Sequence, residues 1–154
     1  MSITRQVMAA ALGLTISLHV AAERATYKVG KFSEDYRATV TVDGDAAGTS
    51  GVISVFDTHT GKRLVRVAAD SLPFDLRDGE VPANIKELPY GEQSVLIYED
   101  FNFDGKQDLA IMDGQKSCYG GPSFQIFLAS EQGFRRNPEF TRLCAPFCAV
   151  RPRT

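Results

Sequence analysis

Apolar and polar residues alternate along most of the chain that follows residue 22. The stretch YRATVTV (36–42) has an apolar residue at every second position, as expected for a strand with one buried face. In GVISVFDTHTGKRLVRVAA (51–69) two such stretches flank a turn at 57–61, where Gly61 supplies the positive φ that tight turns need. The pattern therefore predicts a strand at 36–42 and a β-hairpin at 51–69.

The second half of the chain shows the same period of two. We expect strands at 94–100 (SVLIYED), 108–113 (DLAIMD) and 123–130 (SFQIFLAS), with a further hairpin turn near 131–133. After residue 22, no long stretch has apolar residues at i, i+3, i+4 and i+7, which is the spacing of a helix. The prediction is a mainly β fold of antiparallel sheets made of hairpins, with few or no helices.

One long segment interrupts this alternation. Residues 70–93 contain three prolines and two glycines and show weak periodicity, which indicates an ordered loop with one turn of helix around 83–87. A connection of this length inside a compact domain is often functional, although a plain crossover between two sheet layers explains it at least as well.

The first 22 residues have the layout of a secretory signal peptide. Arg5 precedes an apolar stretch at 7–18, and small residues at 20–22 offer a cleavage site before Glu23. The apolar stretch is shorter than the roughly 18 residues that favour a membrane span, and a buried N-terminal helix is the less favoured alternative. We expect one β-rich domain at 23–154, periplasmic or secreted, with no membrane insertion of the mature form.

The charge of the mature chain argues against nucleic acid as a partner. Removal of residues 1–22 takes away Arg5 and moves the formal charge from −2 to −3. The 132 residues that remain carry no basic patch interleaved with aromatic residues, so binding of nucleic acid is not expected. Their number is sufficient for one domain with a hydrophobic core.

Three cysteines, Cys118, Cys144 and Cys148, fall in the last quarter of the chain. In an oxidising compartment at least one disulfide is expected. Reflection of the chain across the turn near 131–133 places Cys144 almost opposite Cys118, so we predict that pair, with Cys148 free or competing. A zinc site needs about four nitrogen or sulfur ligands, and beyond residue 22 only His59 could join the cysteines, so zinc is not expected.

The sequence YEDFNFDGKQDLAI (98–111) places oxygen-bearing side chains at alternate positions of a loop. Positions 1, 3, 5 and 9 are Asp100, Asn102, Asp104 and Asp108. Calcium takes about six to eight oxygen ligands, and carboxylates at alternate positions can curl around one ion. Gly105, at position 6, allows a sharp bend, and the backbone carbonyl of Lys106, at position 7, completes the predicted ligand set.

The alternatives to a β-hairpin calcium loop fit these residues less well. An EF-hand needs a bidentate acid at position 12, which is Ile111 here, so the loop is the shorter D-x-[DN]-x-D-G-x-x-D type between two strands. A plain Asp-Gly hairpin tip would not explain why four oxygen-bearing side chains avoid the even positions. Magnesium suits sites that keep more water. Phe101 and Phe103, at even positions, are expected to point away from the ion and to anchor the loop on the core.

No catalytic pattern is apparent after residue 22. His59 is the only histidine there and lies on a predicted turn, which argues against a catalytic triad or a histidine–metal hydrolase. The chain lacks G-x-S-x-G, a P-loop and a dinucleotide-binding fingerprint. Its clustered acids suit metal ligation better than a glycosidase pair. We therefore expect a calcium-binding protein that is not an enzyme.

Three segments together resemble a family of small exported bacterial proteins. They are GVISVFDTHTGKRLVRV, YEDFNFDGKQDLAIMDG and CYGGPSFQIFLASEQGFRRNPEFTRL, which cover roughly residues 50–143. The loop itself resembles the calcium hairpin of FG-GAP and related β-repeat proteins. The family includes periplasmic calcium-binding inhibitors of lysozyme-like peptidoglycan hydrolases, which act as immunity proteins.

The resemblance implies a calcium-stabilised β fold that blocks the active-site cleft of a cell-wall hydrolase with a protruding loop. The ligand roles would fall on Asp100, Asn102, Asp104, Asp108 and the carbonyl of Lys106. No inhibitory residue carries over; Tyr119, on a glycine-rich turn, is a weaker candidate for partner contact than for packing on the sheet. The alternative hypothesis is a structural or adhesive calcium-binding module without an enzyme target.

The end of the chain departs from that family. Its members continue with more strands after N-P-E-F-x-x-L, whereas this chain ends in CAPFCAVRPRT. A short branch of the family and a truncated C-terminus are the two alternatives, and truncation would leave sheet edges open.

Overall fold

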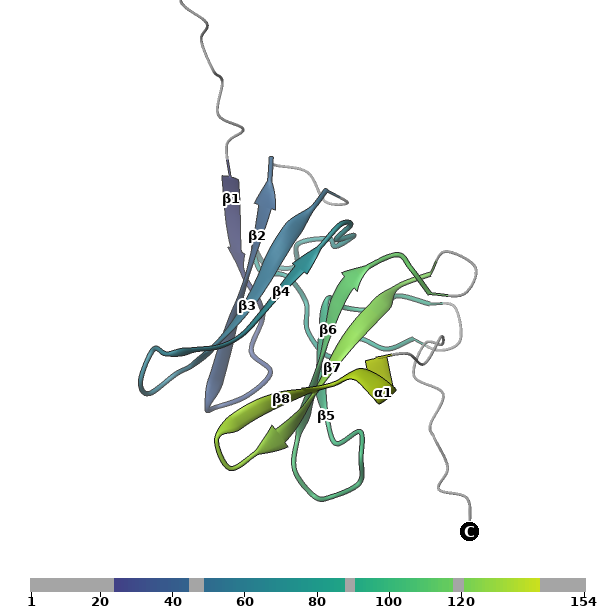
Figure 1. Ribbon diagram of the computed structural model, residues 1–154. Coiled ribbons are helices and arrows are strands. Elements are labelled where there is room, and N and C mark those ends of the chain that lie inside the picture. The colour runs from purple at the N-terminus through teal and green to yellow at the C-terminus, as the bar shows by residue number, and fades with distance from the viewer. Residues whose placement is uncertain (1–23, 45–48, 88–90, 118–120, 142–154) are drawn as a thin grey trace, which may run out of the picture.

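The computed structural model describes residues 24–44, 49–87, 91–117 and 121–141. Within these ranges the chain forms two four-stranded antiparallel sheets (Figure 1). The first sheet contains, in spatial order, β1 (Arg24–Lys28), β2 (Tyr36–Asp43), β3 (Gly51–Asp57) and β4 (Arg63–Ala69). The second contains β5 (Leu96–Glu99), β6 (Asp108–Gly114), β7 (Ser123–Ser130) and β8 (Gly133–Asn137), and is followed by one short helix, α1 (Pro138–Thr141). The predicted mainly β fold is confirmed.

The hairpins form where the sequence pattern places them. Strands β3 and β4 pair in antiparallel register around a turn in which Gly61 has φ 70°. Strands β7 and β8 pair down to Ser130 opposite Gly133, whose φ is 110°. Both glycines adopt a left-handed backbone that other residues enter at a cost, so local sequence fixes where each hairpin turns.

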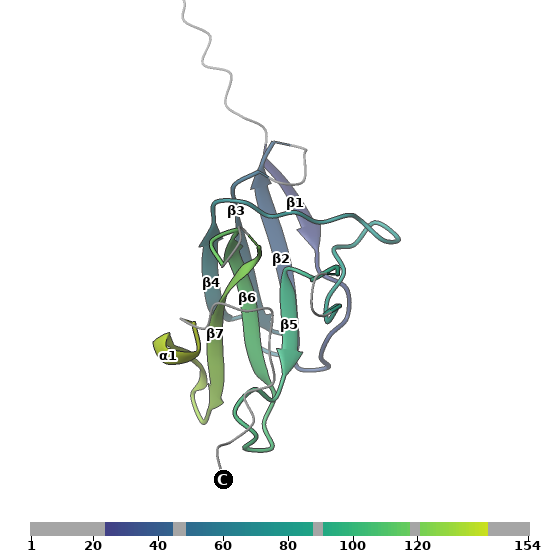
Figure 2. The same cartoon turned by 90° about the vertical axis from the view of Figure 1, so that its right-hand side faces the viewer.

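The two sheets stack on each other and enclose one core (Figures 1 and 2). Tyr36 of β2 makes edge-to-face contacts with Tyr98 of β5 and Phe134 of β8, with ring centroids 6.1 and 5.0 Å apart. Ile53 from the first sheet and Leu109 from the second are fully buried between them. Burial of these alternating apolar side chains is the main stabilising contribution to the fold.

The two sheets differ in how their outer faces are covered. In β4, buried Val65, Val67 and Ala69 alternate with exposed Arg66 and Ala68, which is the pattern of a strand with one face in water. In β6, all residues from 108 to 112 are buried, so both faces of this strand are covered. This explains why 94–100 and 108–113 are more uniformly apolar in sequence than the strands of the first sheet.

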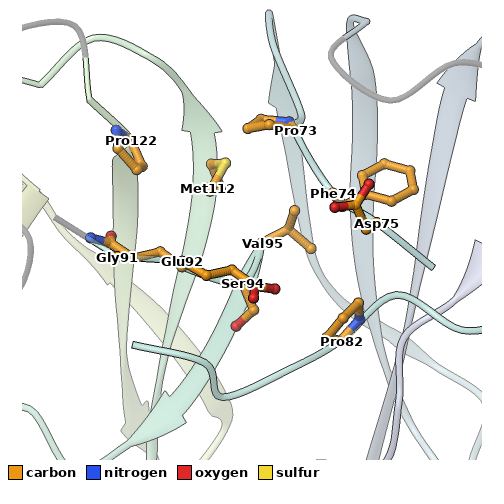
Figure 3. A pocket seen from close by; sticks show the side chains of 11 residues that line it. Pro73, Phe74, Asp75, Pro82, Gly91, Glu92, Ser94, Val95, Met112 and Pro122 are labelled. Atoms are coloured by element: carbon orange, nitrogen blue, oxygen red, sulfur yellow. The ribbon is translucent and has the colours of Figure 1, made fainter. Parts of the chain in front are cut away.

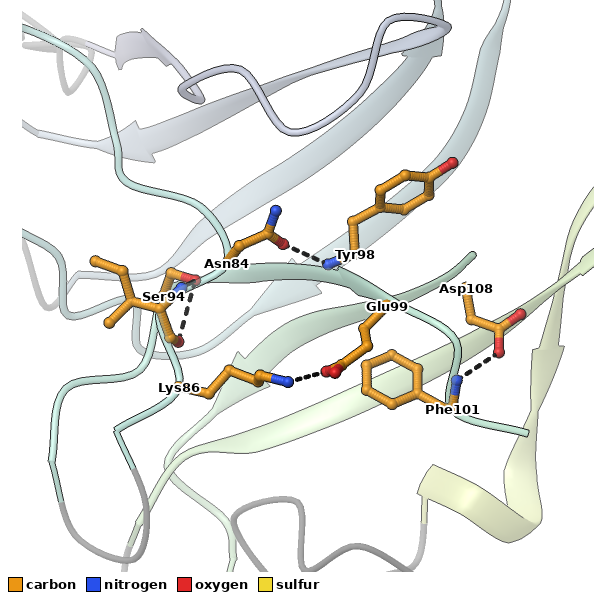
Figure 4. A network of polar contacts seen from close by, with 8 residues as sticks. Asn84, Lys86, Ser94, Tyr98, Glu99, Phe101 and Asp108 are labelled. Carbon is orange, nitrogen blue, oxygen red and sulfur yellow. Dashed lines mark hydrogen bonds and ion pairs between the residues drawn. The ribbon is translucent and has the colours of Figure 1, made fainter. Parts of the chain in front are cut away.

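The segment 70–93 crosses from the first sheet to the second and runs along the edges of both. Val81 exchanges backbone hydrogen bonds with Lys28 and Gly30, both 2.8 Å, beside β1. Asn84 then binds the edge of β5, since its amide donates to the Leu96 carbonyl (3.0 Å) and its Oδ1 accepts from the Tyr98 amide (2.7 Å; Figure 4). The segment therefore covers sheet edges that would otherwise expose unpaired backbone groups.

The prediction of a helical turn around 83–87 is wrong. Asn84 has φ 61°, which a right-handed helix does not tolerate, and an isolated β-bridge joins Lys86 to Gln93. Strand β1 was not expected from the sequence. Among the described residues, no helix has the length and apolar character needed to cross a membrane. The predicted signal peptide at 1–22 lies outside the described residues.

Candidate functional site

The predicted calcium loop connects β5 to β6 at one end of the second sheet, below β5 in Figure 1. Glu99 and Asp108 are opposite each other in the strand register, so they mark the base of the loop. Gly105 has φ 85°, and a Cβ added there would meet no atom within 4 Å. The turn therefore depends on the backbone freedom of glycine, as the sequence predicts.

Asp100 organises the loop from its first position. Its carboxylate accepts hydrogen bonds from two consecutive amides, those of Asp104 (Oδ1, 3.2 Å) and Gly105 (Oδ2, 2.8 Å). An aspartate that binds amides four and five residues further on closes the loop around its own side chain.

Asn102 and Asp104 also direct side-chain oxygens to amides of the loop. Asn102 Oδ1 lies 3.2 Å from the Asp104 amide, the same amide that Asp100 binds. Asp104 Oδ1 accepts from the Lys106 amide at 2.8 Å, and its Oδ2 accepts from Asn102 Nδ2 at 3.0 Å. These hydrogen bonds, first of all the one from the Lys106 amide, hold the pKa of Asp104 below its usual value.

Asp108 differs from the other three because it is fully buried. Its Oδ2 accepts from the Phe101 amide (3.0 Å; Figure 4), and its Oδ1 accepts from the Ala129 amide on β7 (2.8 Å). Burial raises the pKa of Asp108, the two amide hydrogen bonds oppose that rise, and the charges of Asp104 and Asp100 add to it. The carboxylate thus links the base of the loop to the neighbouring strand.

The loop gathers the predicted side chains without assembling a finished metal cage. Within the described ranges, no group of three or more His, Cys, Asp or Glu side chains has the arrangement of a metal centre. The oxygens of Asp100, Asn102 and Asp104 instead bind three consecutive loop amides, those of residues 104, 105 and 106. Lys106 is exposed at the tip. The donors are hard oxygens, which is the ligand type that calcium prefers.

The two loop phenylalanines have opposite environments, and here the sequence prediction is half wrong. Phe101 is half-buried and packs against the core, as expected. Phe103 is 68% exposed, so it does not anchor the loop on the core. The reason is that Phe103 has φ 62°, which takes the backbone out of the extended region and breaks the alternation on which the prediction relied.

A pocket of about 410 Å³ lies away from this loop. Figure 3 shows Phe74 and Pro82 on one side of it and Met112 and Pro122 on the other. None of the predicted site residues lines it, and Glu92 at its rim is already paired with Arg77 at 2.5 Å. Gln93 Oε1, the one buried side-chain atom without a hydrogen-bond partner in the described part of the chain, belongs to a lining residue.

Several predicted residues cannot be placed in this fold. Tyr119 and the cysteines of the predicted disulfide, Cys118 and Cys144, lie outside the described residues, as does Cys148. His59 is exposed on the β3–β4 turn, as expected, with Nε2 3.3 Å from Asp35 Oδ1. The described residues around it include no serine or cysteine bound to the imidazole.

Fold and loop together define the class: a two-sheet antiparallel β-protein with an oxygen-rich loop between neighbouring strands. A solved structure described as that of a Xanthomonas type IV secretion system related protein has a similar fold, with a TM-score of 0.50 and 17% sequence identity. The similarity covers 81% of this chain but 62% of that chain, so this protein spans less than two thirds of its length. At this identity the likeness shows the fold alone. No family model and no curated protein matches the chain.

Proposed function

We propose that this protein is an exported, non-enzymatic calcium-binding protein that binds and inhibits a lysozyme-like peptidoglycan hydrolase. The observation that carries the calcium part is the loop at 100–108. Asp100 binds the amides of Asp104 and Gly105, and Asn102 and Asp104 add further oxygens that accept from the amides of Asp104 and Lys106. A turn needs fewer acids than this loop contains, whereas a cation site needs several.

Calcium in this loop would be held by the side chains of Asp100, Asn102 and Asp104, by the Lys106 carbonyl, and by Asp108 directly or through water. The ion would supply positive charge among carboxylates that otherwise repel one another. That repulsion is visible at Asp108, where the charges of Asp104 and Asp100 contribute to the raised pKa. Calcium binding would therefore stabilise the connection between β5 and β6.

The inhibitory part of the proposal has separate support. The segments that resemble periplasmic hydrolase inhibitors correspond to β3–β4, β5–β6 and β7–β8 with α1, and so extend over both sheets. The N-terminal sequence is typical of an exported protein. The structural relative is described as related to a type IV secretion system, and at 17% identity it supports the fold of the proposal alone.

Thermal unfolding of the mature chain with and without calcium tests the metal site. Ligand at 100 times its Kd is expected to stabilise the native state by about 2.7 kcal/mol if only that state binds. Asp104→Ala is expected to lose the gain, because it removes an exposed carboxylate that is one of the proposed ligands.

Asp57→Ala is the matched control, since Asp57 opens the β3–β4 turn in the way that Asp100 opens the calcium loop. The control variant should keep the full gain from calcium. A wild-type melting temperature that calcium does not change would refute the metal site. An equal gain from magnesium would refute selectivity for calcium.

Inhibition is tested by the clearing of peptidoglycan suspensions by lysozyme-like muramidases, including any encoded beside this gene. Wild-type protein is expected to slow at least one of them in a dose-dependent way. Calcium binding without inhibition or binding of any enzyme would instead support the alternative, a structural or adhesive calcium module. Clearing by the purified protein alone would show that it is itself a hydrolase.

A further inference from the structure

Phe103 is the most exposed large apolar side chain among the described residues, with 68% of its surface accessible. Leu76, at 45%, is the other large hydrophobic side chain that is exposed in this part of the chain. Scattered apolar residues on a surface need no explanation by themselves. Phe103 differs because its backbone conformation is unfavourable as well.

The backbone of Phe103 has φ 62°, in the left-handed region. Glycine or asparagine enters this region at little cost, whereas a bulky aromatic residue is an outlier there. The ring does not repay the cost through core contacts, because it is mostly in solvent. Folding therefore favours another residue at position 103, and the ring gives no visible benefit to the isolated chain.

Hydrogen bonds and packing fix the backbone on both sides of this ring. Phe101, two residues before, packs against the core, and its amide donates to buried Asp108. On the other side of Phe103, the amides of residues 104, 105 and 106 are all bound by oxygens of the loop. A ring on a fixed backbone loses only side-chain freedom when it binds, which is a favourable property for an anchor residue in a protein interface.

We propose that the loop at 100–106 is a docking surface for a folded protein, with the Phe103 ring inserted into an apolar pocket of that partner. This inference rests on the proposed function, because the partner is the hydrolase named there. It assigns the contact to the β5–β6 tip instead of to Tyr119 or to the segment 70–93.

The surroundings of the ring favour a protein over a membrane surface. Its chain neighbours are Asn102 and Asp104, and the one cation in the loop is Lys106. Segments that enter a membrane interface present several apolar residues flanked by lysine and arginine, since anionic lipids attract positive charge. A single aromatic ring between an amide and a carboxylate matches the pocket of a protein better.

The test uses the mature protein with Phe103→Gly and Phe103→Ala, at one fixed calcium concentration. Binding to the panel of lysozyme-like muramidases is measured by calorimetry and by inhibition. Both variants are expected to bind about 30-fold or more weakly, the loss typical of an interface anchor. Phe103→Gly should also melt at or above the wild-type temperature, because glycine relieves the backbone. Leu76→Ala is the matched control and should bind within about 5-fold of wild type.

Each other result overturns the inference in its own way. Unchanged binding by both Phe103 variants would remove the loop as the contact and leave the proposed function intact. Wild-type protein that binds none of the enzymes would overturn both proposals. Loss of binding to vesicles of phosphatidylcholine and phosphatidylglycerol in Phe103→Gly, with enzyme binding kept, would identify a membrane as the occupant. A lower melting temperature of Phe103→Gly would show that the ring stabilises the fold.

Discussion

Two hairpin tips in this protein begin with an aspartate and turn on a glycine. In the β3–β4 tip, Asp57 Oδ1 accepts hydrogen bonds from the amide of Thr60 (2.7 Å) and from its hydroxyl (2.9 Å), and Gly61 has φ 70°. In the β5–β6 tip, Asp100 accepts from two amides and Gly105 has φ 85°. Up to this point the two tips satisfy their backbone groups in the same way.

The β5–β6 tip also contains side chains that have no counterpart in the β3–β4 tip. One acid is sufficient to close the β3–β4 tip, whereas the other also contains Asn102, Asp104 and the buried Asp108. It also exposes Phe103 on a left-handed backbone. An Asp-Gly turn accounts for Asp100, and the two amide partners of Asp108 account for that buried acid, so a function has to be sought for Asn102 and Asp104.

The largest expected difference between the tips comes from Asp108→Ala. This change leaves the half-buried amides of Phe101 and Ala129 without the Asp108 acceptor. Each such amide costs about 1–3 kcal/mol, so we expect a loss of about 2–6 kcal/mol in the free energy of unfolding. Denaturant titration of wild type and variant without calcium measures it.

Two further variants make this prediction specific. Asp108→Asn retains one acceptor oxygen and should lose less than Asp108→Ala. Asp57→Ala removes an exposed carboxylate from the other tip and should have a smaller effect than either. If Asp57→Ala were the more destabilising change, the buried carboxylate would not be the main structural difference between the tips.

Much of the fold could be predicted because alternation reports directly on which face of a strand is buried. Alternation predicted the strands correctly where the backbone is extended, as in β2, β3 and β7. It failed at β1, an edge strand in which no residue is buried, so the pattern carries no strong signal. It also failed at Asn84 and Phe103, because their positive φ values change the direction of the side chains that follow.

The candidate site shows a second limit of the sequence. The oxygens of Asp100, Asn102 and Asp104, which the spacing predicts as ligands, bind amides of the loop in this structure. The spacing also predicts Asp108 as a ligand, but it does not indicate that this residue is buried. Its partner Ala129 is 21 residues further along the chain and meets it only through the β6–β7 pairing. A local sequence motif does not report tertiary contacts of this kind.

Replacement of each turn glycine by alanine should have effects of intermediate size. Neither Gly61 nor Gly105 has an atom within 4 Å of an added Cβ, so the cost at both is conformational. We expect Gly61→Ala and Gly105→Ala each to destabilise the protein by about 1 kcal/mol without calcium. The thermal unfolding of both variants measures this cost.

Calcium is expected to affect the stability of the two glycine variants differently. With saturating calcium, the loss should grow for Gly105→Ala, because a strained loop binds the ion less well, and should stay constant for Gly61→Ala. Equal losses with and without calcium at both positions would argue that the β5–β6 tip is a plain turn like the other one.

The smallest expected effect concerns the charge of Asp57. Its pKa lies below the ordinary value of 3.8, chiefly because the Thr60 amide donates to the ionised carboxylate. A lowered pKa in the folded state means that ionisation stabilises the fold above pH 3.8, and that this contribution is lost as the pH falls through the folded-state pKa. Asp57→Asn keeps an acceptor oxygen but removes the charge, so it should lower the melting temperature slightly at about pH 6 and match wild type at about pH 2. A difference that is the same at both pH values would show that the turn does not favour the ionised carboxylate, and that it stabilises the tip through the acceptor oxygen alone.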